Sequence, residues 1–344
     1  MPSVLTERHL GRALLARQLL LERSSLSLPR ALERIGGIQA QYTPSTYVGL
    51  WSRLEGFESE QLERALERRT VVQGTLMRIT IHLVSARDWW PFAVGVRDAR
   101  RRYLVRTQRR SEREFEAAGR KIRKQIAGTT LTQAEMRKLL GEPGGRLSAA
   151  TWIDLVRVPP SGTWARRRAD IHAAAEDWLG TSGDDIDPSD AVDHLVRARL
   201  RGFGPATRAE IADWAGIPPA AVAASLERLD LRRFSDEAGT ELVDLPRAPL
   251  PDPDTPAPPR LLPVWDAVTL KSMSRAGILP DKYRPRFMNA TSAQSMNAFL
   301  VDGHVAGVWK IEGGRVEFDP FEKVDRGAMR ELREEAGRLA QFHR

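Results

Sequence analysis

Two glutamines separated by one residue, Gln39 and Gln41, have the spacing best suited to chemistry in this chain. They follow a pair of glycines and precede Thr43-Pro44, which indicates an extended turn in which the two side chains point the same way. Each amide both donates and accepts hydrogen bonds. An amide cannot be an acid or base at neutral pH, but it can hold a water molecule or stabilise charge through its dipole. The alternative is an ordinary loop with two exposed glutamines.

The usual catalytic patterns are absent from the sequence. It contains no cysteine, no phosphate-binding glycine loop and no HExxH or GxSxG motif, and its first lysine is Lys121. The six histidines are scattered, and His82 lies in an apolar run that favours a core position. We therefore expect no metal ion and no cofactor.

Positive charge is concentrated in the first third of the chain. The formal net charge is +8, and residues 1–120 carry 21 Lys and Arg against 13 Asp and Glu. Residues 96–124 alone have 12 basic and 4 acidic residues, which a single helical stretch would present as a positive face. A solvated helix in an arginine-rich protein is the alternative, because only seven of the 53 basic residues are lysines.

A weak internal repeat gives the organisation of the chain. Residues 200–230 predict a helix capped by Thr207 and stopped by Gly216, then a second helix begun by Pro218-Pro219, which is the helix-turn-helix pattern. Further copies fit residues 131–157, with Thr132 as N-cap, a break at 141–145 and Ser148 as the next cap, and residues 28–54. Strand-like stretches that could form wings follow the copies, at 71–85, 158–168 and 231–245.

The remaining segments complete the expected architecture. Residues 247–263 contain seven prolines and predict an extended linker, and short alternating runs beyond it end in an amphipathic helix at 324–342. The fold class predicted is mainly α with α+β elements: three tandem winged-helix units and a small C-terminal β-rich domain ending in a helix. The alternative is a generic helical bundle. Expected domains are 1–86 with the glutamines, 87–178 with the basic helix, 187–246, the linker 247–263, and 264–344.

At these residues the sequence closely resembles the tandem winged-helix DNA glycosylases of the AlkZ and YcaQ type. The matching stretches span nearly the whole chain, in order: GGIQAQY, PSTYVGLWSRL, LMRITIHLV, PPSGTW, HLVRARLRGFGPATRAEIADW, PRLLPVWD and FLVDGHVAGVW. The family's catalytic motif, Gln, a nonpolar residue, then Asp or Gln, falls on Gln39, Ala40 and Gln41. Gln41 makes the chain similar to the AlkZ-type branch, whereas Ile79 stands where many relatives have glycine.

The resemblance implies a monofunctional DNA glycosylase. Its reaction is hydrolysis of the N-glycosidic bond of N7- or N3-alkylated purines, in DNA repair and in self-resistance to bulky alkylating antibiotics or interstrand crosslinks. An alkylated purine of this kind is already cationic and leaves as a neutral base, so the site needs water and charge stabilisation rather than a strong acid. Gln39 and Gln41 are the expected catalytic residues, with no lysine near them in sequence to form a Schiff base.

The resemblance also implies contacts to DNA, including a β-hairpin that enters the minor groove. The candidate hairpin runs from Phe299 to Lys310. The candidate DNA-binding residues are Arg78, Arg100, Arg101, Arg102, Arg166, Arg167, Arg168, Asp302, Gly303 and His304.

The expected partner is double-stranded DNA containing alkylated purines, bound by a monomer in the cytoplasm at the nucleoid. No apolar run is long enough to span a membrane. Two other functions fit the same sequence features: a non-catalytic winged-helix regulator, and a protein that sequesters the alkylating drug.

Overall fold

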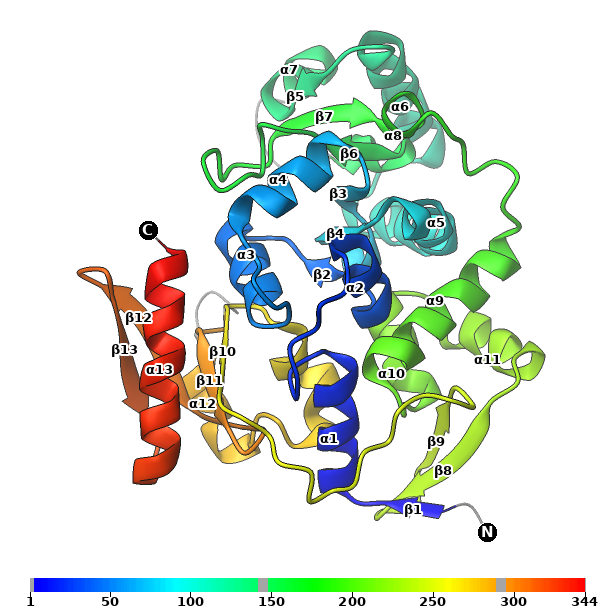
Figure 1. Cartoon of the computed structure of the whole chain (residues 1–344). Helices are drawn as coiled ribbons and strands as arrows, with labels where there is room; N and C mark the ends of the chain where they lie inside the picture. Colours follow the sequence, from blue (N-terminus) through cyan, green and yellow to red (C-terminus); the bar gives the residue numbers. More distant parts are fainter. Residues whose placement is uncertain (1–2, 142–147, 289–294, 344) are drawn as a thin grey trace.

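The computed structural model describes residues 3–141, 148–288 and 295–343, and it shows a mixed α/β fold (Figure 1). The α-helices are α1 Glu7–Arg17, α2 Leu28–Ile35, α3 Thr43–Trp51, α4 Ser59–Glu67, α5 Ala86–Gln108, α6 Glu112–Ile126, α7 Gln133–Leu140, α8 Ala175–Leu179, α9 Pro188–Phe203, α10 Arg208–Ala215, α11 Pro219–Arg228, α12 Arg284–Phe287 and α13 Arg326–Phe342. Short 3-10 helices include η1 Met77–Ile79, η2 Ser148–Trp152 and η4 Lys271–Ala276.

Three β-sheets organise these helices. Their strands are β1 Ser3–Leu5, β2 Ile38–Gln39, β3 Val71–Thr75, β4 Ile81–Ser85, β5 Leu131–Thr132, β6 Leu155–Arg157, β7 Ile171–Ala174, β8 Arg232–Asp236, β9 Glu241–Asp244, β10 Arg260–Leu262, β11 Ala298–Val301, β12 His304–Glu312 and β13 Arg315–Pro320. The sheet orders are β1-β8-β9, β10-β11-β12-β13 and β2-β4-β3-β6-β7-β5. The six-stranded sheet joins the first two repeats, since β3 pairs with β6.

The third repeat forms the elements that its sequence predicts. Thr207 caps α10 through a capping box, and Gly216 ends the helix in the left-handed conformation that glycine adopts without strain. The helix α11 begins after Pro218, and β8 and β9 then form an antiparallel pair. The parallel pairing of β1 with β8 ties the N-terminus to this segment.

The other two repeats depart from the pattern in part. In the second, Thr132 caps α7 and Gly141 ends it as expected, but the next helix is the short η2, and residues 142–147 of the expected break lie outside the described residues. The expected wing at 158–168 is a loop between β6 and β7. In the first repeat, α3 ends at Trp51, the unexpected helix α4 follows, and β3 and β4 form the expected strand pair.

The basic stretch forms two helices rather than one. The helix α5 ends where Arg109 takes a left-handed conformation. Ser111 then caps α6, because its hydroxyl oxygen accepts a hydrogen bond from the Glu114 amide. The basic residues are therefore divided between two helices, and α6 buries an apolar face that includes Phe115 and Ile122.

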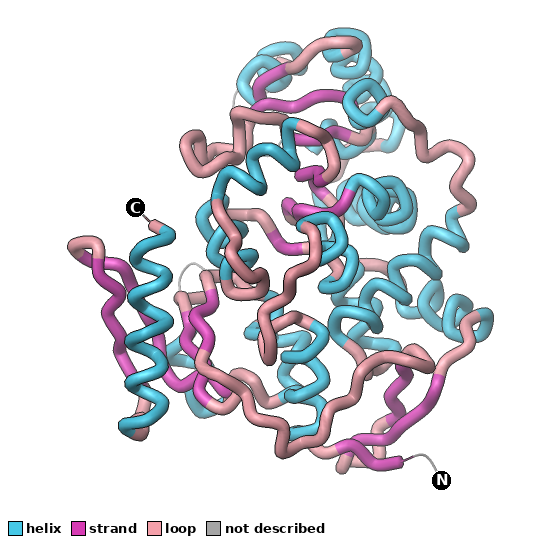
Figure 2. Tube along the Cα trace, viewed as in Figure 1, coloured by secondary structure: helices cyan, strands magenta, loops and turns pink. Residues whose placement is uncertain are grey.

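The proline-rich segment is bound to the protein along its length. Figure 2 shows it as a long loop that passes α1 before it enters β10. Three arginines of α1, Arg8, Arg12 and Arg17, donate to its carbonyl oxygens, and Arg17 also forms a fully buried ion pair with Asp244 at 2.7 Å. This linker therefore fixes the C-terminal sheet to the N-terminal helix.

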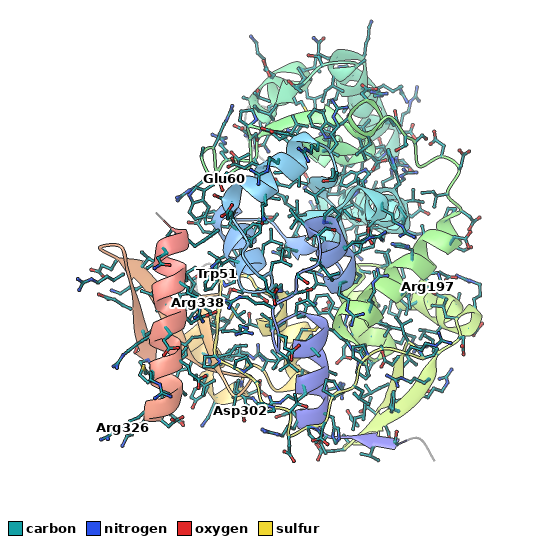
Figure 3. The ribbon with its side chains drawn as sticks, in the orientation of Figure 1. Trp51, Glu60, Arg197, Asp302, Arg326 and Arg338 are labelled. Atoms are coloured by element: carbon teal, nitrogen blue, oxygen red, sulfur yellow. The ribbon has the colours of Figure 1, made fainter. Side chains whose placement is uncertain are left out.

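The terminal helix α13 covers the C-terminal sheet and reaches α3. Glu335, on α13, pairs with Arg23, whose guanidinium lies 4.6 Å from the centre of the Trp51 ring. Trp51, labelled in Figure 3, also meets Phe342 of α13, with their ring centres 6.3 Å apart. This contact places the C-terminal sheet beside the segment that carries the two glutamines.

Candidate active site

Gln39 is held in a short strand directly after a glycine turn. Gly36 and Gly37 both have positive φ angles, and a Cβ on Gly37 would lie 2.9 Å from the Val84 side chain. The turn therefore needs glycine, because it brings the chain from α2 close against β4. Gln39 then pairs with His82 across the sheet, and the Ala40 amide donates to the Ile81 carbonyl at 2.7 Å.

The two glutamine side chains reach the same loop between β3 and β4. The Oε1 atom of half-buried Gln39 accepts a hydrogen bond from the Arg78 guanidinium at 3.4 Å, and that of exposed Gln41 accepts one from the Ile81 amide at 3.2 Å. Neither side-chain NH₂ group has a partner within the described ranges. Each Oε1 also keeps one lone pair. The site thus has two oriented amides with donors and acceptors left for a substrate or a water.

The loop that holds the glutamines contains two left-handed residues. Arg78 has φ 52° and Ile79 has φ 57°. This conformation costs an ordinary residue about 1–2 kcal/mol, and more for a β-branched one. Glycine would adopt this conformation at position 79 without strain, and backbone strain of this kind concentrates at functional sites.

The helix α10 packs against this loop on the side away from the glutamines. The Arg78 guanidinium donates to the Trp214 carbonyl, and a Cβ on Gly216 would lie 2.9 Å from the Arg78 nitrogen. Burial lowers the pKa of Arg78 below its ordinary value. The sequence predicted a DNA phosphate contact for Arg78, and the structure places this residue between Gln39 and α10, with a hydrogen bond to each. Sequence reasoning missed Trp214 because it is 136 residues away.

The histidine beside Gln39 is uncharged. His82 is buried in β4, and burial, with a further contribution from the Arg78 charge, lowers its pKa to about 3. Its Nδ1 atom lies 3.1 Å from the Thr80 carbonyl. His82 is therefore a core histidine, as its apolar surroundings in sequence indicated. No group of three or more His, Asp or Glu residues that could hold a metal occurs in the described part of the chain.

A small cavity opens on the inner side of Gln39. It has a volume of about 20 Å³, and a site needs roughly 10–15 Å³ for one water molecule. Ser45 lines it too, and the Ser45 hydroxyl is buried with no hydrogen-bond partner among residues whose positions are described. The buried ion pair between Arg53 and Asp266, at 2.8 Å, forms another wall. A single water molecule fits in this cavity beside Gln39.

Two of the three arginines expected on α5 have structural partners. Arg100 is 5% exposed and donates to the Thr75 carbonyl at 2.8 Å and to Asp154 at 3.2 Å. Arg101 donates to the Trp152 carbonyl. Arg100 is therefore not an exposed phosphate contact, because the helical period turns it toward the sheet. Arg102 is exposed and remains a candidate.

The other arginine cluster lies beside the glutamines. Arg166, Arg167 and Arg168 are exposed in the loop between β6 and β7, and the Thr43 hydroxyl donates to the Arg167 carbonyl at 2.6 Å. The Trp164 amide in the same loop donates to the Tyr47 hydroxyl at 3.0 Å. The loop therefore meets the beginning of α3, two residues after Gln41. The sequence alone does not show that these arginines lie near Gln41, because more than 120 residues separate the two segments.

The turn expected to enter a DNA groove is docked on α1. Asp302, labelled in Figure 3, pairs with Arg8 at 3.1 Å and with buried Arg12. A Cβ on Gly303 would lie 2.5 Å from Arg12. The Nδ1 atom of His304 lies 2.9 Å from the Gly277 carbonyl. The β11–β12 hairpin exists as the sequence predicts, and its turn is held against α1 by ion pairs, although the Asp302 side chain is still about half exposed, at 52%.

The neighbouring hairpin presents an open tip instead. Gly313 and Gly314 connect β12 to β13, and a Cβ at either position would have no atom within 4 Å. Both flanking strands are partly exposed near this turn. Sequence reasoning overlooked this second turn, although its glycine pair is a recognised hairpin signal.

The third helix-turn-helix segment, the exposed arginines and the two oriented amides are features expected of a hydrolase that acts on DNA. The chain belongs to the AlkZ-like DNA glycosylase family, whose model matches residues 32–342. It is therefore a DNA glycosylase, an enzyme of DNA repair, and its substrate is DNA. No curated protein sequence matches it.

The fold is similar to that of a solved glycosylase structure. It matches the Streptomyces sahachiroi DNA glycosylase AlkZ with a TM-score of 0.82 and 18% sequence identity, over 98% of this chain and 97% of that chain. None of the described helices is both long and apolar enough to cross a membrane.

Proposed function

We propose that this glycosylase excises N7- or N3-alkylated purines, including bulky antibiotic adducts and interstrand crosslinks, from double-stranded DNA. The observation that supports the substrate class is the chemistry of the site: Gln39 and Gln41 are oriented amides, and the neighbouring His82 is neutral. Such a site offers little help to a neutral purine, which needs a proton before it can leave. A cationic alkylpurine leaves without one.

Gln39 and Gln41 are the catalytic residues in this proposal. Gln39 borders a cavity with room for one water molecule, and Gln41 lies on the exposed side of the same loop. The C1′–N bond breaks and the alkylpurine leaves as a neutral base, while the two amide dipoles stabilise the positive charge left at the deoxyribose. The water oxygen then bonds to C1′, and the proton that it loses goes to solvent. Arg78 accounts for the orientation of Gln39, because it occupies one lone pair of the amide oxygen.

The DNA lies across the exposed arginines in this proposal. Arg102 and the loop with Arg166 to Arg168 contact phosphates, and the three helix-turn-helix segments with their strand pairs serve as tandem winged-helix units. The C-terminal sheet contributes the groove-entering hairpin, and the open tip at Gly313 and Gly314 fits that role better than the docked turn at Asp302 to His304. The enzyme works as a monomer at the nucleoid.

A substrate panel tests the proposal. Labelled duplexes carry one N7-methylguanine, one uracil or one hypoxanthine, and abasic sites are counted after alkali treatment. We expect release of N7-methylguanine alone, and no covalent enzyme–DNA adduct after borohydride treatment, because the reaction needs no amine nucleophile. Excision of the neutral bases at comparable rates would contradict the assignment of a cationic substrate.

A further inference from the structure

A second cavity lies in the same sheet as the glutamines, on the far side of β3. It has a volume of about 160 Å³ and is lined by residues of β3, β6, α5 and α7, among them Thr75, Arg100, Gln133, Asp154 and Arg157. This volume is about eight times that of the cavity beside Gln39, so it has room for a small polyatomic anion such as phosphate.

Arg157 brings an unpaired positive charge to this cavity. Its Nε atom donates to the Ala169 carbonyl and its Nη1 atom to the Thr75 hydroxyl, both at 3.2 Å, and both acceptors are neutral. No carboxylate lies within ion-pair distance of Arg157 among the described residues. Its second terminal nitrogen therefore remains available to a ligand. Burial alone lowers the pKa of Arg157 to about 10, so the side chain is still charged at neutral pH.

The rest of the lining does not compensate this charge. The carboxylate in the wall, Asp154, is already shared between Arg97 at 2.8 Å and Arg100 at 3.2 Å. His172 also lines the cavity, but burial and the Arg157 charge hold its pKa at about 3, so it is neutral. A buried cation without a counterion is costly, and the cost disappears when an anion binds.

We propose that this cavity binds a phosphate group, with Arg157 as its principal ligand. The phosphate belongs either to the DNA backbone or to a free anion, and the chemistry of recognition is the same for both. The site goes beyond base excision, since none of its residues belongs to the glutamine site. In the sheet, Arg157 on β6 pairs with Gln73 on β3, Gln73 pairs with Leu83 on β4, and Leu83 pairs with Ile38 on β2. Arg157 therefore lies three strand spacings from β2. This distance is about 14 Å, within the ~30 Å width of an interface that buries roughly 1,000 Å².

The test measures phosphate binding separately from glycosylase activity. Inorganic phosphate is titrated into the full-length protein in chloride buffer at constant ionic strength, and binding is followed by calorimetry. We expect one site in the wild type, at least tenfold weaker binding in Arg157→Met, and unchanged binding in the matched control Arg330→Met, an exposed arginine on α13. Arg157→Lys keeps a cation in the cavity and should bind with intermediate affinity, which provides a second variant if Arg157→Met does not fold.

A second arm separates the two sources of phosphate. The logarithm of the affinity for undamaged duplex is measured against the logarithm of salt concentration. If a backbone phosphate occupies the cavity, Arg157→Met reduces this slope by about 0.9, the value for one released counterion. An unchanged slope together with loss of the inorganic phosphate site assigns the cavity to a free anion. If wild type binds no inorganic phosphate and the slope of Arg157→Met equals that of wild type, the proposal is overturned, whatever the glycosylase assay shows.

Discussion

Arg78 is the residue for which sequence and structure predict different roles, so its replacement by methionine is informative. The structure makes it a positioning residue: its guanidinium donates to the Gln39 amide oxygen at 3.4 Å and to the Trp214 carbonyl. A hydrogen bond from a charged donor contributes about 1.5–3 kcal/mol, and the 3.4 Å length places this one at the low end. A loss of about 1.5 kcal/mol from the transition state corresponds to roughly a tenfold fall in rate.

The assay is single-turnover release of N7-methylguanine from a labelled duplex, combined with the salt dependence of duplex binding. For Arg78→Met we expect the rate of base release to fall about tenfold while the salt slope stays that of wild type, because no phosphate contact is lost. Folding stability should change little, since the substitution removes a buried charge along with its hydrogen bonds. A slope reduced by about 0.9 with an unchanged rate would refute the positioning role and restore the phosphate contact expected from sequence.

Three further predictions follow from burial and charge. Asp244→Ala leaves Arg17 as a buried charge without its ion-pair partner and should lower the free energy of unfolding, measured by urea titration, by about 3–5 kcal/mol. The control Glu241→Ala breaks an exposed ion pair in the same hairpin and should lower it by less than about 1 kcal/mol. The pKa of His82 lies near 3 in the folded state and near 6.5 in the unfolded state, so as the pH falls the unfolded state takes up the proton first. His82 should therefore lower the free energy of unfolding by about 1.4 kcal/mol for each pH unit between roughly pH 6 and pH 4. His82→Gln should remove that share of the slope, measured by unfolding at each pH, and an identical slope would show that His82 is not buried neutral. Arg102→Met should reduce the salt slope of duplex binding by about 0.9 without loss of stability, and an unchanged slope would exclude a phosphate contact at this exposed arginine.

Local signals in the sequence predicted helices and turns well where the interactions are also local. The helix α10 illustrates this, since Thr207 caps it, Glu210 completes the capping box and Gly216 ends it, all within ten residues. The β11–β12 hairpin was likewise indicated by Asp302-Gly303. The short helix η2 and the loop at 158–168 departed from expectation because tertiary packing, rather than local propensity, decides such weak elements.

Roles that depend on distant partners could not be predicted from the sequence. A run of arginines in α5 looks uniformly basic, but Arg100 turns inward to Thr75 and Asp154 and Arg102 turns outward. The turn at Asp302 is fixed by Arg12, which lies 290 residues earlier in the chain. The spacing of Gln39 and Gln41 indicated an amide site, but no neighbouring residue in the sequence indicated that Arg78 would donate a hydrogen bond to Gln39. Charge and residue type are therefore readable from sequence, whereas the direction of a side chain is not.

The most direct test of the account is single-turnover release of N7-methylguanine by Gln39→Ala and Gln41→Ala. Gln125→Ala, an exposed glutamine on α6, is the matched control. Removal of one oriented dipole from a site of this kind typically costs about 10²–10³ in rate, so we predict a fall of at least about a hundredfold for Gln39→Ala, with duplex affinity within about twofold of wild type and the control at full rate. If Gln39→Ala and Gln41→Ala release the base at the wild-type rate, the two glutamines are not the catalytic residues and the central claim is contradicted.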